Sequence, residues 1–524
     1  MQQPAFVALF LSIVLLGAAF RFPELALKPL HGDEANQGVK AAHLLETGDY
    51  TYDPFEHHGP TLYYLTLPVF WLCGTHTLHE ATEPQLRVVP AFFGVLTIAL
   101  LWGLRDALGR GGLLWAALLT AVSNAMVYYS RYYIQESLFV CFALAAIVAG
   151  WRFAKAPGMG KALLLGAMLG LLHATKETAI VLYAAGGAGV VAVYLWERVA
   201  TGRWYDLRPY LRPGLVAGII LAALLVSVSF YSSFGTHPRG VLDSILTYGR
   251  YFQRADGTGS AGAHDKPFLY YLQLLFFTYR EPGPWWTEGF ALVLSLLGAL
   301  LALRGTQTEP QAETSGIRRF HRFLFVYPLL LVVVFSAIAY KTPWNLLPFW
   351  QPLLLLAGLA VAWLTQRAGT PIIRAVLCLA CCAAVAHAGR QAWQGSFVYP
   401  ADTRNPYVYA HTTTALARVL ERVDQIAAVH PEGDRLVVAV VGEGGDYWPL
   451  PWYLRHYPNV GYWNSPPEKL DADIVIASAR FGPVLMERIG TGYHAETGAL
   501  RPNAILGVFV KSSLWDAFMA GRTK

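Results

Sequence analysis

Long apolar stretches dominate the pattern of hydrophobic and polar positions along this chain. A helix needs about 20 predominantly apolar residues to span a bilayer, and a window of that length finds about eleven such stretches. We therefore predict an α-helical polytopic membrane protein. The predicted spans lie near residues 4–21, 87–104, 113–130, 137–151, 161–175, 178–196, 213–233, 287–303, 323–340, 346–366 and 372–389.

The pattern changes after residue 400. Short apolar runs at 434–441, 472–477 and 505–510 have the length and composition of buried strands, and helical periodicity lies between them at 408–428 and 482–489. This alternation predicts a small α/β domain. We expect a transmembrane module at residues 1–395 and an external domain at residues 396–524.

Basic residues follow every second predicted span, as at Arg105, Arg152, Arg198 and Arg319. The positive-inside rule makes these loops cytoplasmic. The loops 22–86 and 234–286 and the C-terminal domain are then external, and the N-terminus is cytoplasmic. The first span has no Lys or Arg before it, so we expect an uncleaved first helix.

Composition narrows the possible functions. Residues are 55% hydrophobic and 14% charged, with a mean hydropathy of +0.38, whereas soluble domains have about 25% charged residues. The net charge of +6 does not suggest nucleic-acid binding. Charges are nearly absent from the middle of the spans, which argues against an ion-coupled transporter and favours chemistry at the external surface.

The first external loop has the most distinctive polar sequence. Asp33 and Glu34 open an amphipathic helical pattern that ends at Gly48. Successive helix positions lie about 100° apart, so the two carboxylates point in different directions and Glu34 leans toward the apolar side. Glu56, His57 and His58 precede a second helical pattern. The alternative interpretation is a solvated loop with two surface helices.

This order of motifs resembles the GT-C membrane glycosyltransferases of the protein mannosyltransferase and aminoarabinose transferase type. Their first external loop has an Asp-Glu pair, a Gly-Asp-Trp/Tyr turn and a Pro-x-Leu-x-Tyr stretch. The counterparts here are Asp33-Glu34, Gly48-Asp49-Tyr50 and Pro60-Thr-Leu-Tyr-Tyr64. The sequence around Asp33 looks most like that of a prokaryotic subgroup linked by name to archaeal N-glycosylation and flippase activity.

Later positions extend the resemblance to about residue 366. Arg131 and Glu136 match a family spacing, and Arg87 resembles an Arg-x-Pro turn. Tyr340-Lys341 to Pro348 is similar to a Lys-x-Pro-x-Tyr-x-x-Pro signature. Two positions depart from the family pattern: His58 follows His57 where relatives have Glu-Lys-Pro-Pro, and Glu177 replaces glycine after Lys176.

The resemblance implies an enzyme at the outer face of a prokaryotic plasma membrane. It would transfer a sugar from a polyprenyl-phosphate donor to a protein, lipid or glycan acceptor, with inversion. Asp33 would be the general base, and Glu34 and Glu136 would orient the acceptor or Asp33. Cations beside Tyr and Trp at membrane depth suit a lipid phosphate, although each alone is more often an interfacial anchor. The candidate substrate-binding residues are His58, Arg87, Arg131, Lys176, Arg250, His264, Lys266 and Lys341.

Two further expectations complete this interpretation. Glu56 and His57 are the candidate ligands of a divalent cation, and no other cofactor is expected. The alternative to an enzyme is a non-enzymatic membrane component that assists flipping or hand-over of lipid-linked sugars, which needs the lipid cavity but no base.

Overall fold

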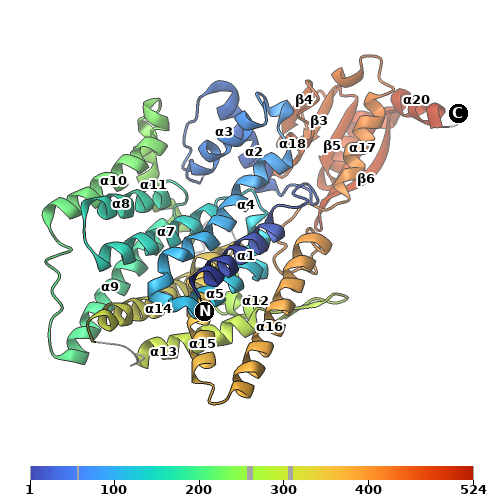
Figure 1. Cartoon of the computed structure of the whole chain (residues 1–524). Coiled ribbons are helices and arrows are strands. Elements are labelled where there is room, and N and C mark those ends of the chain that lie inside the picture. The colour runs from blue at the N-terminus through green and yellow to red at the C-terminus, as the bar shows by residue number, and fades with distance from the viewer. Residues whose placement is uncertain (1, 56–57, 256–263, 305–310, 523–524) are drawn as a thin grey trace.

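The structure is a computed structural model. It describes residues 2–55, 58–255, 264–304 and 311–522, and residues 250–255 and 311–314 by their backbone alone. A bundle of long helices fills most of the molecule, and a smaller α/β domain lies at one end of it (Figure 1). The bundle helices are α1 (Gln3–Arg21), α4 (Glu83–Leu100), α5 (Arg105–Val122), α7 (Glu136–Lys155), α8 (Met159–His173), α9 (Ala179–Thr201), α10 (Pro213–Tyr231), α13 (Gly289–Arg304), α14 (Gln311–Ala337), α15 (Leu347–Arg367) and α16 (Pro371–Trp393).

The prediction of a polytopic helical protein is confirmed. Within the described residues, 8 helical stretches are long and apolar enough to cross a membrane, and the longest of them, Glu83–Val122, contains both α4 and α5. Each predicted span falls on a bundle helix. The stretch 113–130 is not one helix, because α5 ends at Val122 and the Ser123 side chain caps the short α6 (Asn124–Ser130).

The first loop forms α2 (Gly32–Thr47), α3 (Thr61–Leu72) and the 3₁₀ turn η1 (Leu78–Glu80). Helix α2 ends at Gly48, as its sequence predicts, because that glycine adopts the left-handed conformation (φ 67°). The loop after α10 contains the 3₁₀ turn η3 (Ser233–Gly235), α11 (Arg239–Ala255), α12 (Tyr270–Phe276), β1 (Thr278–Tyr279) and β2 (Trp285–Trp286). The 3₁₀ turn η4 (Pro343–Leu346) joins α14 to α15, and the π-helix η5 (Gln394–Val398) ends α16.

The C-terminal domain contains a five-stranded mixed sheet of order β4-β3-β5-β7-β6. Strands β3, β4 and β5 are parallel, and β7 and β6 continue the sheet antiparallel. The three predicted strands are present as β3, β5 and β7. Strands β4 and β6, which are more exposed than these three, were not predicted from the sequence. The elements are β3 (Val438–Val441), β4 (Val460–Trp463), β5 (Ile474–Ser478), β6 (Tyr493–Arg501), β7 (Ala504–Lys511), α17 (Leu416–Ala427), α18 (Leu450–Tyr453), α19 (Gly482–Ile489) and α20 (Ser512–Arg522).

Helix α18 docks the C-terminal domain on the first loop (Figure 1). The indole of Trp452 donates a hydrogen bond to the carboxylate of Glu83 (2.8 Å), and the Tyr453 hydroxyl accepts one from the Leu30 backbone N–H (2.7 Å). Arg455 donates to the carbonyls of Leu78 and Ala81. The domain therefore lies against the loop that contains Asp33.

Glycines let neighbouring bundle helices approach closely. A Cβ atom added at Gly166 on α8 would lie 2.2 Å from the Ile219 carbonyl oxygen on α10. The same holds at Gly298 on α13, where a Cβ would lie 2.0 Å from the Leu356 oxygen on α15. Backbone atoms cannot swing aside as a flexible side chain can, so these contacts fix the helix pairs.

We predict that Gly166→Ala destabilises the protein by about 1–3 kcal/mol, the usual cost of overpacking. The matched control is Gly187→Ala on α9, where an added Cβ would meet nothing within 4 Å. There alanine should be neutral or stabilise by about 0.5–1 kcal/mol, because glycine weakens a helix interior. Thermal unfolding of the purified variants in detergent measures both. Equal unfolding temperatures for the two variants would contradict the prediction.

Candidate active site

The N-terminus of α2 presents Asp33 and Glu34 in opposite ways. The imidazole Nδ1 of His31 accepts a hydrogen bond from the Asp33 backbone N–H (3.0 Å), and the Glu34 carboxylate accepts one from the His31 backbone N–H (2.9 Å). This reciprocal capping box fixes the first turn of the helix. It turns Glu34 into the protein, while the Asp33 side chain is 55% exposed.

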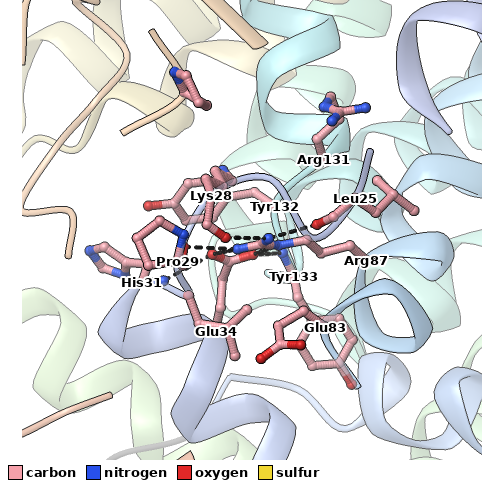
Figure 2. A network of polar contacts seen from close by, with 12 residues as sticks. Leu25, Lys28, Pro29, His31, Glu34, Glu83, Arg87, Arg131, Tyr132 and Tyr133 are labelled. Atoms are coloured by element: carbon pink, nitrogen blue, oxygen red, sulfur yellow. Dashed lines mark hydrogen bonds and ion pairs between the residues drawn. The ribbon is translucent and has the colours of Figure 1, made fainter. Parts of the chain in front are cut away.

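Glu34 forms a fully buried ion pair with Arg87 of α4 (Figure 2). Nε and Nη2 of Arg87 donate to the two carboxylate oxygens at 2.7 and 2.8 Å, and the Tyr133 backbone N–H donates to Glu34 at 2.8 Å. Burial by itself raises the pKa of Glu34, but the charges of Arg87 and Lys28 outweigh burial and hold that pKa below its usual value. Glu34 is therefore an ionised structural anchor whose oxygens are already occupied.

Two arginines fix the segment between α1 and α2. Besides binding Glu34, Arg87 donates to the carbonyls of Leu25, Lys28 and Pro29 (Figure 2). Arg131 donates to the carbonyls of three residues just before them, Arg21, Pro23 and Glu24. The structure thus gives both candidate substrate-binding arginines partners within the protein.

The surroundings of Asp33 come from three separate segments. His31 Nδ1 lies 3.6 Å from its carboxylate. His264, from the loop after α10, and Arg501, at the end of β6, both lie close enough for the Asp33 charge to act on them. No hydrogen bond to the Asp33 carboxylate is present within the part of the chain that the structure describes. Asp33 is thus an available carboxylate between the bundle and the C-terminal domain.

Three of the predicted phosphate-binding lysines gather at the segment between α14 and α15. Lys341 Nζ donates to the backbone carbonyls of Lys266 (3.0 Å) and Ile338. Lys176 Nζ donates to the side-chain oxygen of Asn345 in η4 (3.0 Å). Burial lowers the pKa of Lys341, and the nearby Asp265 opposes that effect. The Lys341 and Lys266 segments also pair through backbone hydrogen bonds, which places His264 beside them.

The remaining candidates next to this cluster are paired with carboxylates. Lys176 forms a buried ion pair with Glu136 (2.5 Å), so Glu136 does not pair with Arg131. His58 Nδ1 lies 2.9 Å from the Glu177 carboxylate. His58 and Glu177 are two positions that depart from the family pattern, and they contact each other. Glu177, which follows Lys176 in sequence, thus has His58 as a polar partner.

Some predicted residues are not described by the structure. Glu56 and His57, the candidate metal ligands, lie outside the described residues, and Arg250 is described by its backbone alone. Elsewhere in the described chain, no group of three or more His, Cys, Asp or Glu side chains could hold a metal ion. We therefore derive no step through a metal.

Sequence analysis missed two histidines that border the site. The rings of His31 and His411 stack at 5.8 Å, and each contacts Tyr132. His31 also meets Trp344 of η4 edge-on at 6.1 Å. His31 opens the acid-pair motif and could have been read as a helix cap. No signal pointed to His411, because it comes from the connection to the C-terminal domain and approaches only in the folded chain.

Comparisons with known proteins agree with this architecture. A family model described as dolichyl-phosphate-mannose-protein mannosyltransferase matches residues 66–231, from α3 to the end of α10. Over 98% of its length the chain is similar to 99% of ArnT from Cupriavidus metallidurans, in a crystal structure bound to undecaprenyl phosphate, with a TM-score of 0.64 and 15% identity. No curated protein sequence matches the chain.

A second solved structure has a similar fold. The oligosaccharyltransferase of Archaeoglobus fulgidus is similar over 98% of this chain and 77% of its own, with a TM-score of 0.61 and 11% identity. At these identities the likeness establishes the fold. The chain therefore has the fold of these two structures, in agreement with the resemblance of its first-loop motifs.

We predict that breaking the Glu34–Arg87 pair from one side strongly destabilises the protein. Glu34→Gln and Arg87→Met should each cost about 3–5 kcal/mol, because the remaining charge is buried without its partner. The double variant Glu34→Gln/Arg87→Met should cost less than the sum of the two. Thermal unfolding with Asp33→Asn as the exposed neighbouring control measures this. Losses near that of Asp33→Asn would show that the pair is not an anchor.

Proposed function

We propose that the protein transfers a sugar from a polyprenyl-phosphate donor to an acceptor at the outer face of the plasma membrane, with inversion at the anomeric carbon. The observation that carries the proposal is the contrast at the start of α2. Glu34 is fully buried and paired, while its neighbour Asp33 is exposed and available. Of the two carboxylates, the structure of the turn depends only on that of Glu34.

Asp33 acts as the general base in this proposal. It accepts the proton of the acceptor as that group attacks the anomeric carbon, and the phosphate leaves from the opposite face. A base must reach its proton within about 3 Å, directly or through one water. The capping box and the Glu34–Arg87 pair hold the first turn of α2, so Asp33 is positioned by a rigid support. Glu34 serves in this proposal as a positioning residue.

The donor phosphate binds at the lysines around η4. Lys341 donates to the backbone carbonyl of Lys266 just before η4, and Lys176 donates to the side chain of Asn345 within η4. Lys176 also pairs with Glu136. The polyprenyl chain lies along the apolar helices. The ArnT crystal structure, which shares this fold, is bound to undecaprenyl phosphate. His264 lies between this cluster and Asp33.

The C-terminal domain contributes to acceptor selection. Arg501 of β6 comes close to Asp33, and α18 contacts α2 directly. Acceptors reaching Asp33 therefore pass beside this domain. This arrangement requires the first loop and the domain to lie on the same, external side of the membrane, as the distribution of basic residues predicts.

We predict that Asp33→Asn lowers turnover by about 10²–10⁴, the usual contribution of general-base catalysis. Asparagine keeps the size of the side chain but cannot take up the proton. Donor affinity should hardly change, since the cations that bind the phosphate lie elsewhere. The matched control is Asp49→Asn, an exposed carboxylate of the same loop that pairs with His237. Transfer to a panel of acceptors and donor binding should both be measured.

The result separates an enzyme from a flipping or hand-over component. Wild-type transfer by Asp33→Asn would remove Asp33 from the role of base. Absence of transfer by the wild-type protein with every polyprenyl-phosphate sugar and acceptor, together with donor binding, would favour the non-enzymatic alternative.

We predict the opposite pattern for Lys341→Ala. Donor affinity should fall by about tenfold or more, because hydrogen bonds to charged groups contribute about 1.5–3 kcal/mol. Turnover at saturating donor should stay within a few-fold of the wild type. Lys155→Ala, which removes a lysine paired with Asp106 on the predicted cytoplasmic side, is the control. Unchanged donor affinity in Lys341→Ala would exclude a phosphate contact at this lysine.

A further inference from the structure

A small pocket opens between the α1–α2 segment and the end of α16. It lies beside the Glu34–Arg87 pair but is separate from the lysines around η4. Leu27 on its rim is 44% exposed, so the pocket reaches the surface of the molecule. Its lining residues are Leu25, Leu27, Lys28, Tyr128, Arg131, Ser396 and Pro400.

Two buried polar side chains in this pocket have no hydrogen-bond partner within the described structure. Lys28 is 6% exposed, and its Nζ lies over the ring of Tyr132 at 3.7 Å without meeting an acceptor. Ser396 of η5 is 3% exposed, and its Oγ is also unpartnered. Buried polar groups in proteins are nearly always paired, and a buried ammonium without a partner is costly. Two such groups from distant parts of the sequence converge on one pocket.

The charges around Lys28 are predominantly positive. Burial lowers the pKa of Lys28, and the cations Arg87 and Arg131 lower it further, against the opposing charge of Glu34. Glu34 cannot serve as its partner, since Arg87 already occupies both carboxylate oxygens. The Nη atoms of Arg131 donate to backbone carbonyls, so Arg131 contributes charge to the pocket and little hydrogen bonding. The pocket therefore combines neighbouring positive charge with two donors that meet no acceptor in the described structure.

We propose that this pocket binds a phosphate oxyanion, with Lys28 Nζ and Ser396 Oγ as its hydrogen-bond donors. The pocket is too narrow for a sugar and accepts the oxygen atoms of a phosphate whose remainder stays outside. Its rim of Leu25, Leu27 and Pro400 is apolar and adjoins two apolar helices, α1 and α16. Both a membrane phospholipid headgroup and free phosphate have the required chemistry. The site is distinct from the donor site and does not depend on the transfer reaction.

The test uses the purified full-length protein in neutral detergent. Its unfolding temperature is measured while phosphatidylglycerol, phosphatidylcholine or inorganic phosphate is titrated, because a ligand that binds only the folded state raises that temperature. The variants are Lys28→Met, which keeps the apolar stem over Tyr132, and Ser396→Ala. Lys161→Met removes a half-buried lysine on the predicted cytoplasmic side, which donates to the Ala156 carbonyl, and is the control.

We expect phosphatidylglycerol to stabilise the wild type and Lys161→Met equally. Lys28→Met should weaken the apparent affinity by about tenfold or more, and Ser396→Ala by a few-fold. Without ligand, Lys28→Met should unfold no lower than the wild type, because it removes a buried amine that meets no hydrogen-bond acceptor and keeps the apolar contact with Tyr132. This second measurement separates a lost ligand site from a damaged fold.

The three ligands identify the source of the oxyanion. Stabilisation by phosphatidylglycerol alone indicates a lipid headgroup, and equal stabilisation by inorganic phosphate indicates a free oxyanion. The proposal is overturned if none of the three ligands stabilises the wild type, or if Lys28→Met responds to them as the wild type does.

Discussion

The buried pair between Glu34 and Arg87 is the contact on which the site depends. It joins the first turn of α2 to α4, and the same guanidinium binds three carbonyls of the segment after α1. A charge pair removed from water stabilises a fold only when its geometry is good and its other lone pairs are satisfied. Tyr133 and His31 supply those remaining hydrogen bonds from the backbone. The result is a rigid corner from which Asp33 projects.

This corner also explains how the C-terminal domain reaches the candidate site. Leu30, within the fixed segment, donates to Tyr453 of α18, and Glu83 at the start of α4 accepts from Trp452. The bundle and the C-terminal domain thus share the α1–α2 segment as a common support. Arg501 reaches the neighbourhood of Asp33 because the sheet is held in this position. The site is assembled from segments more than 400 residues apart in sequence.

Two departures from the family pattern are compensated within the fold. A carboxylate at position 177 adds negative charge beside Lys176, where a phosphate is proposed to bind. The Glu177 carboxylate contacts His58, while Lys176 pairs with Glu136. Lys341, just before η4, instead donates to the backbone carbonyls of Lys266 and Ile338, and the charge of Asp265 acts on it. Lys341 is therefore the lysine on which the proposed phosphate contact chiefly depends.

The sequence by itself determined the helical bundle, the end of α2 at Gly48, the three buried strands and the separation of Asp33 from Glu34. The length of an apolar stretch, the period of its apolar positions and the places of glycine are local properties of the sequence. They determine local structure. It did not determine the partners of Arg87, Arg131 and Glu136, nor the approach of His411. A buried charge takes whichever opposite charge or carbonyl the packing brings within about 3 Å, and that neighbour can be anywhere in the chain. Only the tertiary structure decided which charges became anchors and which carboxylate remained available.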